Sequence, residues 1–536
     1  MCLMVRAIGS RAKIISELRE TQRQTQIKQE VESPPLSPAY IRNPSLLSMD
    51  LITTCVEYFF ANLYPTQPIL HRQRMGEIIS QMEVSTEAYC VVVSLCAYMM
   101  IQTNMDSVFP GSHAKSQPAL VIGQTLLHEA IRVRKSLNYI ENPTVWSVVT
   151  SFFLFGCHFC LDRQNAAWFH LREATTLALI IRMHEEDTYA TPDIIDNTRR
   201  RRLYWLLFVT ERAYALQQHK PLTLHATINL PTLDEDPSET VELNGFVHLV
   251  NLFKPFDDTF VGLWNRNKKI ATSEFFSGLQ QQLADALPSY LESVESQAVD
   301  LRCSQQWLRT MVWQLSIHHG FLSSTAAENA MSFKFPIEIS RDLVNATSQF
   351  TKHSMEVHGI GLIEKLFDVA CTLTDVISCV PYEQQSFEYG PRDYLQQLMT
   401  LISNLRGGQQ RYMPLLMSKI NEAMPNQPGR SLVPPSARSE MSDMYDGVDS
   451  SQATNSGPNS QESTPFGSPP LSAVGPHIHP FGRFVQDGAL TSPISMGFPQ
   501  PGVSSAGFDG LLSSSAPVYM EATYQADAMI KYESDD

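Results

Sequence analysis

Residues 145–223 decide the fold, and they read VWSVVTSFFLFGCHFCLDRQNAAWFHLREATTLALIIRMHEEDTYATPDIIDNTRRRRLYWLLFVTERAYALQQHKPLT. Three of the six tryptophans of the chain lie in this stretch, at Trp146, Trp168 and Trp205. Residues 145–161 are apolar nearly all round, which predicts a helix buried inside a large helical body. Because three apolar runs follow one another, the stretch predicts three adjacent helices that form a core.

The second and third of these helices have recognisable faces and ends. Residues 162–165 (DRQN) form the polar break that precedes the second helix. Apolar side chains of the second run recur every three or four residues, as on one helix face. They are Trp168, Leu171, Ala174, Ala178 and Ile181. In the third run, Asp196 is placed to cap the helix and Pro221 is placed to end it.

The segments on both sides of this stretch also follow the helical period. The sequence predicts further helices at residues 49–63, 74–82, 88–102, 117–137, 246–265, 272–294, 303–321, 337–353, 356–380 and 392–405. Pro255 falls at a kink or a start within one of them, and residues 227–231 form a short extended piece. Since no run of alternating strands is present, the predicted fold class is all-α.

The two ends of the chain differ in composition from this helical middle. Residues 1–47 form a basic linker whose coiled-coil pattern is barely longer than one heptad. Residues 425–536 contain 14 prolines, 12 acidic residues and only four basic ones. Such a segment cannot bury enough apolar surface to offset the entropy of ordering. We therefore expect a linker (1–47), one large multi-helix domain (48–424) and a disordered Ser/Pro-rich acidic tail (425–536).

Bulk properties exclude several classes of protein. The 536 residues carry a net charge of -15, so overall charge does not attract nucleic acid. Most of the nine cysteines lie in apolar helical patterns, which indicates reduced, buried thiols rather than a disulfide framework. Residues 145–161 are shorter than the roughly 18 apolar residues of a membrane span and contain His158. No secretory pattern opens the sequence, and no membrane partner is expected.

Residues with catalytic or metal-binding chemistry are sparse. Cys157 and Cys160 form a CxxC inside an apolar helix, without the second pair of ligands that a zinc site needs. His170 and Glu173 do not match the HExxH pattern, and no glycine-rich phosphate loop or nucleophile elbow is present. The sequence therefore predicts buried core thiols, no enzymatic activity, and no metal or other cofactor in these residues.

Four consecutive arginines, at residues 199–202, stand at the start of the third predicted helix. Positive charge at this end opposes the helix dipole, so it needs a reason. One interpretation is pairing with the acids just upstream, which are Glu185, Glu186, Asp187, Asp193 and Asp196. The other is a phosphate-binding or nuclear-import patch. The short sequence separation of the acids favours pairing.

Short motifs in the two terminal segments suggest modification and partner binding. Lys28 and Lys531 each stand in an aliphatic-Lys-x-Glu pattern that is used for attaching small ubiquitin-like modifiers. Ser33 and Ser37 precede prolines and are candidate phosphorylation sites. Acidic and aromatic residues of the tail are candidates for contacts with coactivators, in which the tail folds on binding. These candidates are Phe508, Asp509, Leu511, Leu512, Tyr524 and Tyr532.

Taken in order, several segments resemble the regulatory region of fungal zinc binuclear cluster transcription factors. The matching pieces are residues 58–65 (YFFANLYP), 68–70 (PIL), 154–163 (LFGCHFCLDR), 168–174 (WFHLREA) and 200–212 (RRRLYWLLFVTER) with 220–221 (KP). The resemblance covers about residues 48–415. Its signature residues are Trp168, Arg172, Glu173, Arg200, Arg201, Arg202, Trp205, Glu211, Arg212 and Pro221. Residues 9–20 resemble the linker that follows the zinc cluster in amylolytic and maltose-utilisation activators.

The resemblance implies a nuclear regulator of RNA polymerase II transcription. It further implies a homodimer that activates starch or maltose utilisation genes, with a helical body that responds to an inducer or partner. Promoter DNA would be read by an upstream zinc cluster of six cysteines, and zinc is expected only there. Cys2 is the only cysteine before Cys55, so that cluster is absent from this sequence. Either the start of the protein is missing from the sequence, or this form has lost direct contact with DNA.

Other functions remain open at this point. Arg11 and Lys13 are the candidates for contact with DNA, and phosphate contact by these two alone would be weak and independent of base sequence. The chain could instead be a helical scaffold or cofactor that never binds DNA, or a competitor that dimerises with full-length relatives. An enzyme that uses a pocket of the helical body is a third alternative.

Overall fold

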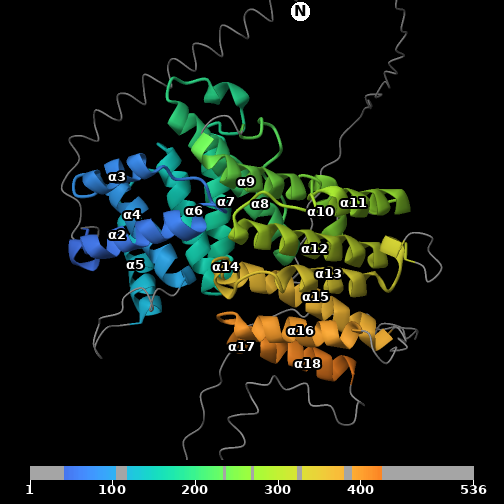
Figure 1. Cartoon of the computed structure of the whole chain (residues 1–536). Coiled ribbons are helices and arrows are strands. Elements are labelled where there is room, and N and C mark those ends of the chain that lie inside the picture. The colour runs from blue at the N-terminus through green and yellow to red at the C-terminus, as the bar shows by residue number, and fades with distance from the viewer. Residues whose placement is uncertain are drawn as a thin grey trace, which may run out of the picture. The chain divides into compact units, whose positions relative to one another are not determined.

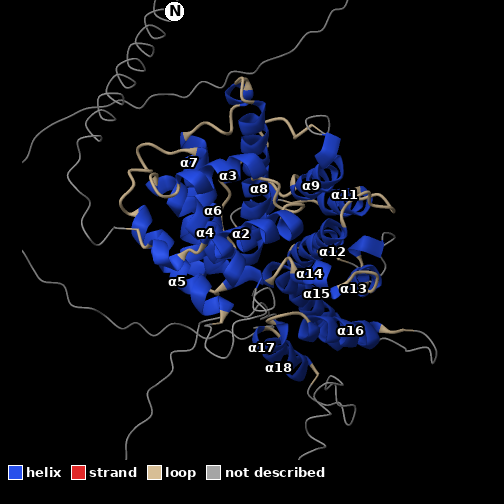
Figure 2. Ribbon diagram, turned by 60° about the vertical axis from the view of Figure 1, so that its left-hand side comes forward, coloured by secondary structure: helices blue, strands red, loops and turns tan. Residues whose placement is uncertain are grey.

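The computed structural model describes residues 42–103, 118–232, 237–266, 271–322, 329–379 and 389–424. Within these residues all regular secondary structure is helical, which confirms the all-α prediction (Figure 2). All of them belong to one unit, Met1–Asp449. The linker and the tail lie almost entirely outside the described residues, so their predicted boundaries and disorder stay predictions.

The first half of the described chain contains the helices of the central stretch and those that pack on them. Their bounds are α2 (Met49–Tyr58), the π-helical segment η3 (Phe59–Leu63) that continues it, α3 (Arg72–Gln81), α4 (Thr86–Thr103), α5 (Ala119–Arg134), α6 (Val145–Cys160), α7 (Gln164–Ile180) and α8 (Ile194–Gln218). Single 3-10 turns occur at Pro44–Leu46 and Glu186–Tyr189.

The second half contains the remaining helices and ends in a layered group. The bounds are η6 (Pro237–Glu239), α9 (Thr240–Phe253), α10 (Asp258–Trp264), α11 (Ser273–Asp285), α12 (Glu295–His318), η7 (Asn329–Met331), α13 (Phe335–Thr347), α14 (Lys352–Glu356), α15 (Ile360–Cys379), α16 (Pro391–Asn404), α17 (Gly408–Arg411) and α18 (Met413–Ala423). Figure 1 shows α9, α12, α15, α16 and α18 following one another as layers, and the pairwise packing of these helices agrees.

Helices α4 and α6 lie at the centre of the first half because almost every side chain on them is apolar or small. α6 starts at a capping box, in which the Thr144 hydroxyl accepts from Ser147 N and the Ser147 hydroxyl accepts from Thr144 N. α4 packs on α5 and α6, and α6 packs on α7. At Gly156 an added Cβ would lie 2.4 Å from the Tyr98 ring, so a glycine is needed where α6 crosses α4.

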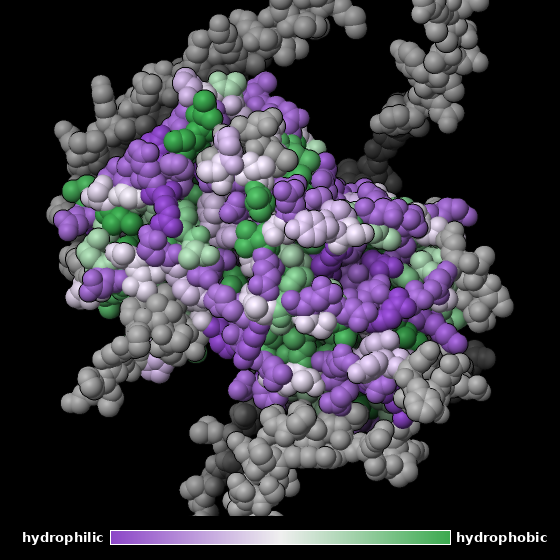
Figure 3. All heavy atoms as spheres, in the orientation of Figure 1, coloured by the Kyte–Doolittle hydropathy of each residue, from purple (hydrophilic) through white to green (hydrophobic). Residues whose placement is uncertain are grey.

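The buried apolar side chains form two separate cores. The first core contains α2 to α11 and one side of α12, with Trp205 and Trp307 among its largest fully buried members. The second core contains α13, α15, α16 and α18 together with Val299, Cys303 and Trp313 of α12. α12 therefore lies between the two cores and contributes side chains to both. The surface face in Figure 3 mixes hydrophilic and hydrophobic residues, and the large exposed apolar side chains are spread over many elements.

Several predicted boundaries are wrong. The second helix of the central stretch begins at Gln164, inside the predicted polar break. The helix predicted at residues 246–265 is two helices, α9 and α10, and the break between them contains Pro255, where a kink or a start was predicted. Asp257 starts α10 by accepting from Thr259 N and Phe260 N. α11 ends nine residues earlier than predicted, at Asp285, and α12 begins eight residues earlier, at Glu295. α18 was not predicted at all.

A search of the described residues for membrane spans gives one weak candidate. No single helix among them is long and apolar enough to cross a bilayer. α3 and α4 meet the length and composition criteria only as a pair, and they are bent by 119° at the break between them.

Candidate functional site

The signature residues gather on α8, on α7 beside it, and on the loop that follows α8. α8 is 25 residues long and is capped by Asp193, whose carboxylate accepts from Asp196 N at 3.0 Å. The prediction that Asp196 is the cap is therefore wrong, because the helix begins at Ile194 and places Asp196 in its first turn. α8 ends at Gln218, where His219 takes a left-handed conformation with φ 51°, and Pro221 follows as an exposed residue.

Replacing Asp193 by alanine should lower the free energy of unfolding by about 1 kcal/mol, since the cap of α8 is lost. The same change removes an exposed ion pair of Asp193 with Arg74, at 2.5 Å, which contributes little in water. Asp193→Asn keeps an oxygen acceptor for the cap and should recover most of the loss. Urea denaturation of the two variants measures this, and equal losses in both would contradict the capping role.

Two of the four arginines, Arg199 and Arg202, converge on one carboxylate. Arg199 Nη2 lies 2.8 Å from Glu239 Oε1, and Arg202 Nη1 lies 2.6 Å from Glu239 Oε2. Tyr64 donates its hydroxyl to Glu239 and accepts from Arg199. Arg202 is fully buried, with 1% of its side chain exposed. Burial opposes ionisation of Glu239, but the hydrogen bonds from Arg199, Tyr64 and Arg202 lower its pKa to about 2.

The remaining arginines, Arg200 and Arg201, use acids from the upstream set. Arg201 forms two hydrogen bonds with Glu186, at 2.7 and 2.9 Å, and these lower the pKa of Glu186 to about 2. Arg200 lies 3.8 Å from Asp196. The arginine run thus forms ion pairs, as predicted. The predicted partners are wrong for Arg199 and Arg202, which pair with Glu239, a residue beyond the loop that follows α8.

Glu211 and Arg212 hold the backbone of one residue in the loop after α8. Glu211 Oε2 accepts from Leu224 N at 2.8 Å, and Arg212 Nη2 donates to Leu224 O at 3.1 Å. Arg172 of α7 donates to the other oxygen of Glu211 at 3.2 Å. Glu211 and Arg212 are both buried, and charged side chains are unusual in a core. Their presence is explained by the two backbone groups of Leu224 that they satisfy.

The loop is fixed to α8 at two further points. Tyr204 Oη donates to His225 O at 2.7 Å, and Trp205 Nε1 donates to Asn229 O at 2.9 Å. Glu186, which Arg201 holds, accepts from Asn229 N at 2.8 Å. Residues 221–232 therefore run along α8 as a loop without helix or strand, as predicted. The signature on α8 is a set of side chains that hold this loop.

Trp168 and Glu173 connect α7 to its neighbours. The Trp168 ring stacks on Tyr214 of α8, with centroids 5.8 Å apart and planes 5° apart. Glu173 accepts from Arg134 at 2.7 Å and from Tyr139 at 2.7 Å, and its Oε2 lies 3.1 Å from His170 Nδ1. Burial opposes ionisation of Glu173, but these partners together lower its pKa to about 2. Both residues therefore join helices within the core.

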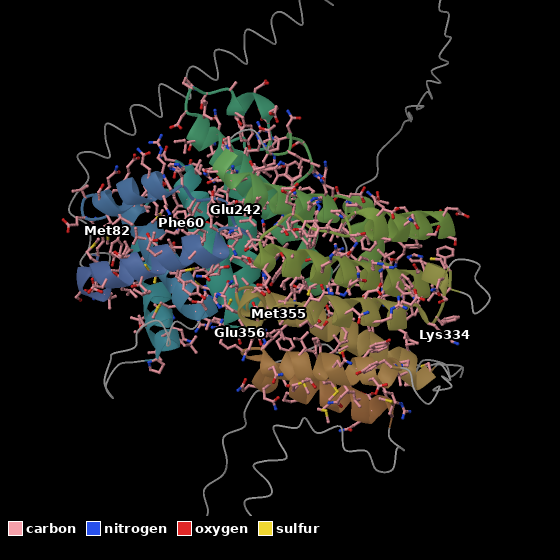
Figure 4. The ribbon with its side chains drawn as sticks, viewed as in Figure 1. Phe60, Met82, Glu242, Lys334, Met355 and Glu356 are labelled. Carbon is pink, nitrogen blue, oxygen red and sulfur yellow. The ribbon has the colours of Figure 1, made fainter. Side chains whose placement is uncertain are left out.

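The same segment of the first core meets the start of α9. Gln297 Nε2 donates to Pro65 O and to Glu242 O, at 2.6 Å each. Figure 4 labels Phe60 and Glu242, and shows the start of α9 close to the segment that follows α2. This packing places Glu239, which precedes α9, beside Tyr64.

The cysteines and histidines of the described residues do not fit a zinc site. Cys157 is buried and Cys160 is half-buried in α6, as core thiols, and burial raises the pKa of the Cys160 thiol to about 12. The rings of His158 and His170 stack 5.2 Å apart. No group of three or more His, Cys, Asp or Glu side chains in these parts of the chain is arranged to hold a metal ion.

Buried ionisable groups on α15 are functional candidates that the sequence did not indicate. Glu364 accepts from Tyr412 at 2.7 Å and lies 3.7 Å from Arg411, while its Oε2 is buried without a hydrogen bond. Asp368 accepts from Trp307 Nε1 at 2.8 Å, and burial raises its pKa to about 6. In sequence these acids look like the polar face of an amphipathic helix, and nothing there indicates that Tyr412 and Arg411 meet Glu364.

Replacing Glu364 by glutamine should remove a pH dependence of stability. Burial raises the pKa of Glu364 to about 7, against an ordinary value of 4.5. The protonated carboxyl therefore contributes stability that is complete below pH 4.5 and is lost as the pH rises through 7. The variant stays neutral, so it should match the wild type near about pH 4 and exceed it by about 3 kcal/mol near about pH 8.

Urea denaturation at these two pH values measures the difference between the proteins. The groups that face Glu364, which are Tyr412, Arg411, Asp368 and Asp162, are present in both proteins, so the comparison isolates the carboxyl. Glu57→Gln, at an exposed carboxylate of α2, should show no such change. An equal stability difference at both pH values would contradict the prediction.

The other candidate residues lie outside the described part of the chain. These are Arg11, Lys13, Lys28, Ser33, Ser37, Phe508, Asp509, Leu511, Leu512, Tyr524, Tyr532 and Lys531. Their proposed roles in DNA contact, modification and coactivator binding stay predictions.

Comparison with known proteins identifies the domain that this geometry belongs to. Residues 56–313 match the family model described as the fungal specific transcription factor domain. The chain is 27% identical over 365 residues to the probable sucrose utilization protein SUC1 of Candida albicans, covering 67% of this chain and 70% of that protein. It is 24% identical over 340 residues to the maltose fermentation regulatory protein MAL13 of Saccharomyces cerevisiae, covering 61% and 68%.

A further relative is the respiratory transcription factor ZNF1 of Saccharomyces cerevisiae, at 23% identity over 340 residues, covering 63% of this chain and 71% of that protein. The matched domain spans α8, its loop and the Glu239 cluster. The chain therefore contains a fungal specific transcription factor domain, and it occupies residues 56–313.

Proposed function

We propose that this chain regulates RNA polymerase II transcription in the nucleus and activates genes for carbohydrate use, with starch or maltose as the nutrient class. The observation that carries the proposal is the fungal specific transcription factor domain at residues 56–313. Relatives named as sucrose and maltose regulators support the nutrient class. In this proposal the helical body is a regulatory platform, the chain acts as a homodimer, and residues 425–536 contact coactivators.

The engagement of the four arginines supports a regulatory role for the helical body rather than a DNA-reading one. Arg199 and Arg202 face Glu239, Arg201 faces Glu186, and Arg200 lies near Asp196. Their exposed side-chain fractions are 14% or less. Phosphate binding by this run would require breaking buried ion pairs, which is strongly unfavourable. We propose that promoter DNA is read by a zinc cluster that these residues do not supply.

A deletion strain tests the nutrient class. Loss of the protein should reduce induction of starch and maltose utilisation genes, and growth on those sugars, while growth on glucose stays normal. Unchanged induction on both sugars would overturn the carbohydrate assignment, although not the transcriptional one.

A fusion of residues 425–536 to a foreign DNA-binding domain tests the activation role. The fusion should raise expression of a reporter, and substitution of Phe508, Leu511 and Leu512 by alanine should remove most of that activity, because apolar side chains anchor segments that fold on binding. A fusion without activity, at normal protein level, would overturn the role of the tail.

Binding of the purified chain, residues 1–536, to promoter fragments tests whether these residues recognise a DNA sequence themselves or act only as a regulatory body. Without a zinc cluster the chain should bind DNA weakly, with the same affinity for unrelated fragments and a loss of binding at raised salt. Metal analysis should find no stoichiometric zinc. Salt-resistant binding to one defined sequence would overturn this part of the proposal.

The alternative function is a helical scaffold or a dimerising competitor of full-length relatives. It differs from the first proposal in one outcome, since the tail fusion would be inactive while the full chain still bound a related protein. We propose no catalytic role, because the domain family is one of transcription regulators.

A further inference from the structure

The two apolar cores meet at a junction that contains two arginines from the C-terminal helices. Helices α13, α15, α16 and α18 pack mainly on one another and on α12. The segment between α16 and α18 makes polar contacts with α4 and with the α6–α7 turn. Arg406 and Arg411 lie in that segment and are separated from their partners by about half of the chain.

Arg406 caps the C-terminus of α4, the central helix of the first core. Its guanidinium donates to the carbonyls of Gln102 and Thr103, in the last turn of α4. Carbonyls in the last turn of a helix have no partner within the helix, and a cation is favourable at this end. The second core therefore supplies the C-terminal cap for the first.

Arg411 makes the second contact across the junction. Its Nη2 lies 2.7 Å from Asp162 Oδ1, in the turn between α6 and α7, and 3.7 Å from Glu364 Oε1 of α15. Tyr412 donates to the same oxygen of Glu364 at 2.7 Å. Arg411 thus bridges a carboxylate of each core.

Two smaller contacts lie at the α14 side of the junction. Gln102 Nε2 donates to Val357 O at 3.0 Å, and His353 Nε2 lies 3.0 Å from Asn62 Oδ1. Figure 4 labels Met355 and Glu356 of α14, where the C-terminal helices approach the N-terminal ones.

The backbone between α16 and α17 is shaped to present Arg406. Gly407 has φ 83°, a conformation that other residues rarely adopt. At Gly408 an added Cβ would lie 1.8 Å from Ile402 O, so only glycine allows the chain to turn so tightly on α16. The two glycines fix the position of Arg406 relative to α16.

We propose that Arg406 and Arg411 form a latch between the two cores, and that opening this latch releases α16, α17 and α18 from α4 and the α6–α7 turn while both cores stay folded. The latch is a device of the fold and does not depend on the proposed function. Local opening of this kind is expected where few contacts hold a segment in place, and Arg406 and Arg411 supply the long-range polar contacts of the segment between α16 and α18.

Hydrogen exchange of the full chain tests the latch, with the double variant Arg406→Gln/Arg411→Gln. Amides in the last turn of α4 and in residues 405–412, between α16 and α18, should exchange about tenfold faster or more, while those of α6, α8 and the core helices α15 and α16 keep their protection. Arg341→Gln, at an exposed arginine of α13 that pairs with its neighbour Asp342, is the matched control and should change neither group.

Unchanged exchange at the end of α4 and in residues 405–412, a uniform rise that includes α6 and α8, or global loss of helical circular dichroism would overturn the proposal. Gly408→Ala keeps both arginines but displaces the turn that presents Arg406, so it should raise exchange at the end of α4 as the arginine variant does. Protection at the end of α4 that is unaffected by Gly408→Ala would show that Arg406 does not hold this helix.

Discussion

Replacing Glu239 by glutamine should lower the free energy of unfolding by about 3–5 kcal/mol, because it removes the carboxylate that faces two buried arginines. Arg202 has 1% of its side chain exposed and Arg199 has 10%, so water cannot compensate for the lost negative charge. The same change weakens the hydrogen bond that Tyr64 donates to Glu239. Chemical denaturation near neutral pH measures the loss.

Two comparisons make this prediction specific. Glu57→Gln removes the partner of Arg72 in a pair whose side chains are 58% and 56% exposed, and it should change stability by less than about 0.5 kcal/mol. The pKa of Glu239 is lowered from 4.5 to about 2, so its contribution is present above pH 4.5 and is lost as the pH falls through 2. The stability difference between the wild type and the Glu239 variant should therefore shrink in acid. A difference that stays constant down to pH 2 would contradict the ion-pair explanation.

The pairing of Glu239 with Arg202 could not be predicted from the sequence. Arg201 and Glu186 are 15 residues apart and meet across a short turn, so their pairing follows from local sequence. Glu239 lies 37 residues after Arg202 and reaches it only because the loop after α8 turns back beside Tyr64. A carboxylate in a polar loop gives no sign of such a contact, since any of the neighbouring acids has the same local chemistry.

Helix positions were predictable where apolar periodicity was strong, and failed where buried side chains are polar. The core helices α6, α7 and α8 were predicted within a few residues, apart from the cap of α8. In the first turn of α12, Ser296 and Gln297 are buried although polar, so the first two turns of this helix look like a linker in sequence. α18 was missed because its three buried side chains, Met413, Leu416 and Ile420, leave most of a short helix polar or half-buried.

The candidate site was predictable as a set of residues but not as a structure. The signature marked Glu211, Arg212 and Trp205, but nothing in their spacing indicates that they hold the backbone of the loop at 221–232. Their partners are mostly backbone atoms, such as Leu224 N and O and Asn229 O, whose positions no side-chain pattern encodes. The structure therefore shows that these signature residues hold the loop against α8.

Truncating Trp205 to alanine should destabilise the protein by about 3–5 kcal/mol, because it removes the largest fully buried side chain of α8 and leaves a cavity. The Trp205 ring packs edge-on against Phe208 at 4.9 Å and against Tyr204 at 6.1 Å, and the surrounding helices leave little freedom to collapse into the cavity. The loop loses one of its attachments as well, although Asn229 O keeps the hydrogen bond from Arg201 at 3.0 Å. Thermal and urea unfolding measure the total loss.

Trp205→Phe separates the packing contribution from that of the hydrogen bond. Phenylalanine fills much of the same volume but donates nothing to Asn229 O, which Arg201 still satisfies, so the loss should be well below that of alanine. Tyr290→Ala, at a side chain that is 84% exposed, should be neutral within about 0.5 kcal/mol. If phenylalanine and alanine at position 205 were equally destabilising, the hydrogen bond to the loop, rather than the buried volume, would be the main contribution of Trp205.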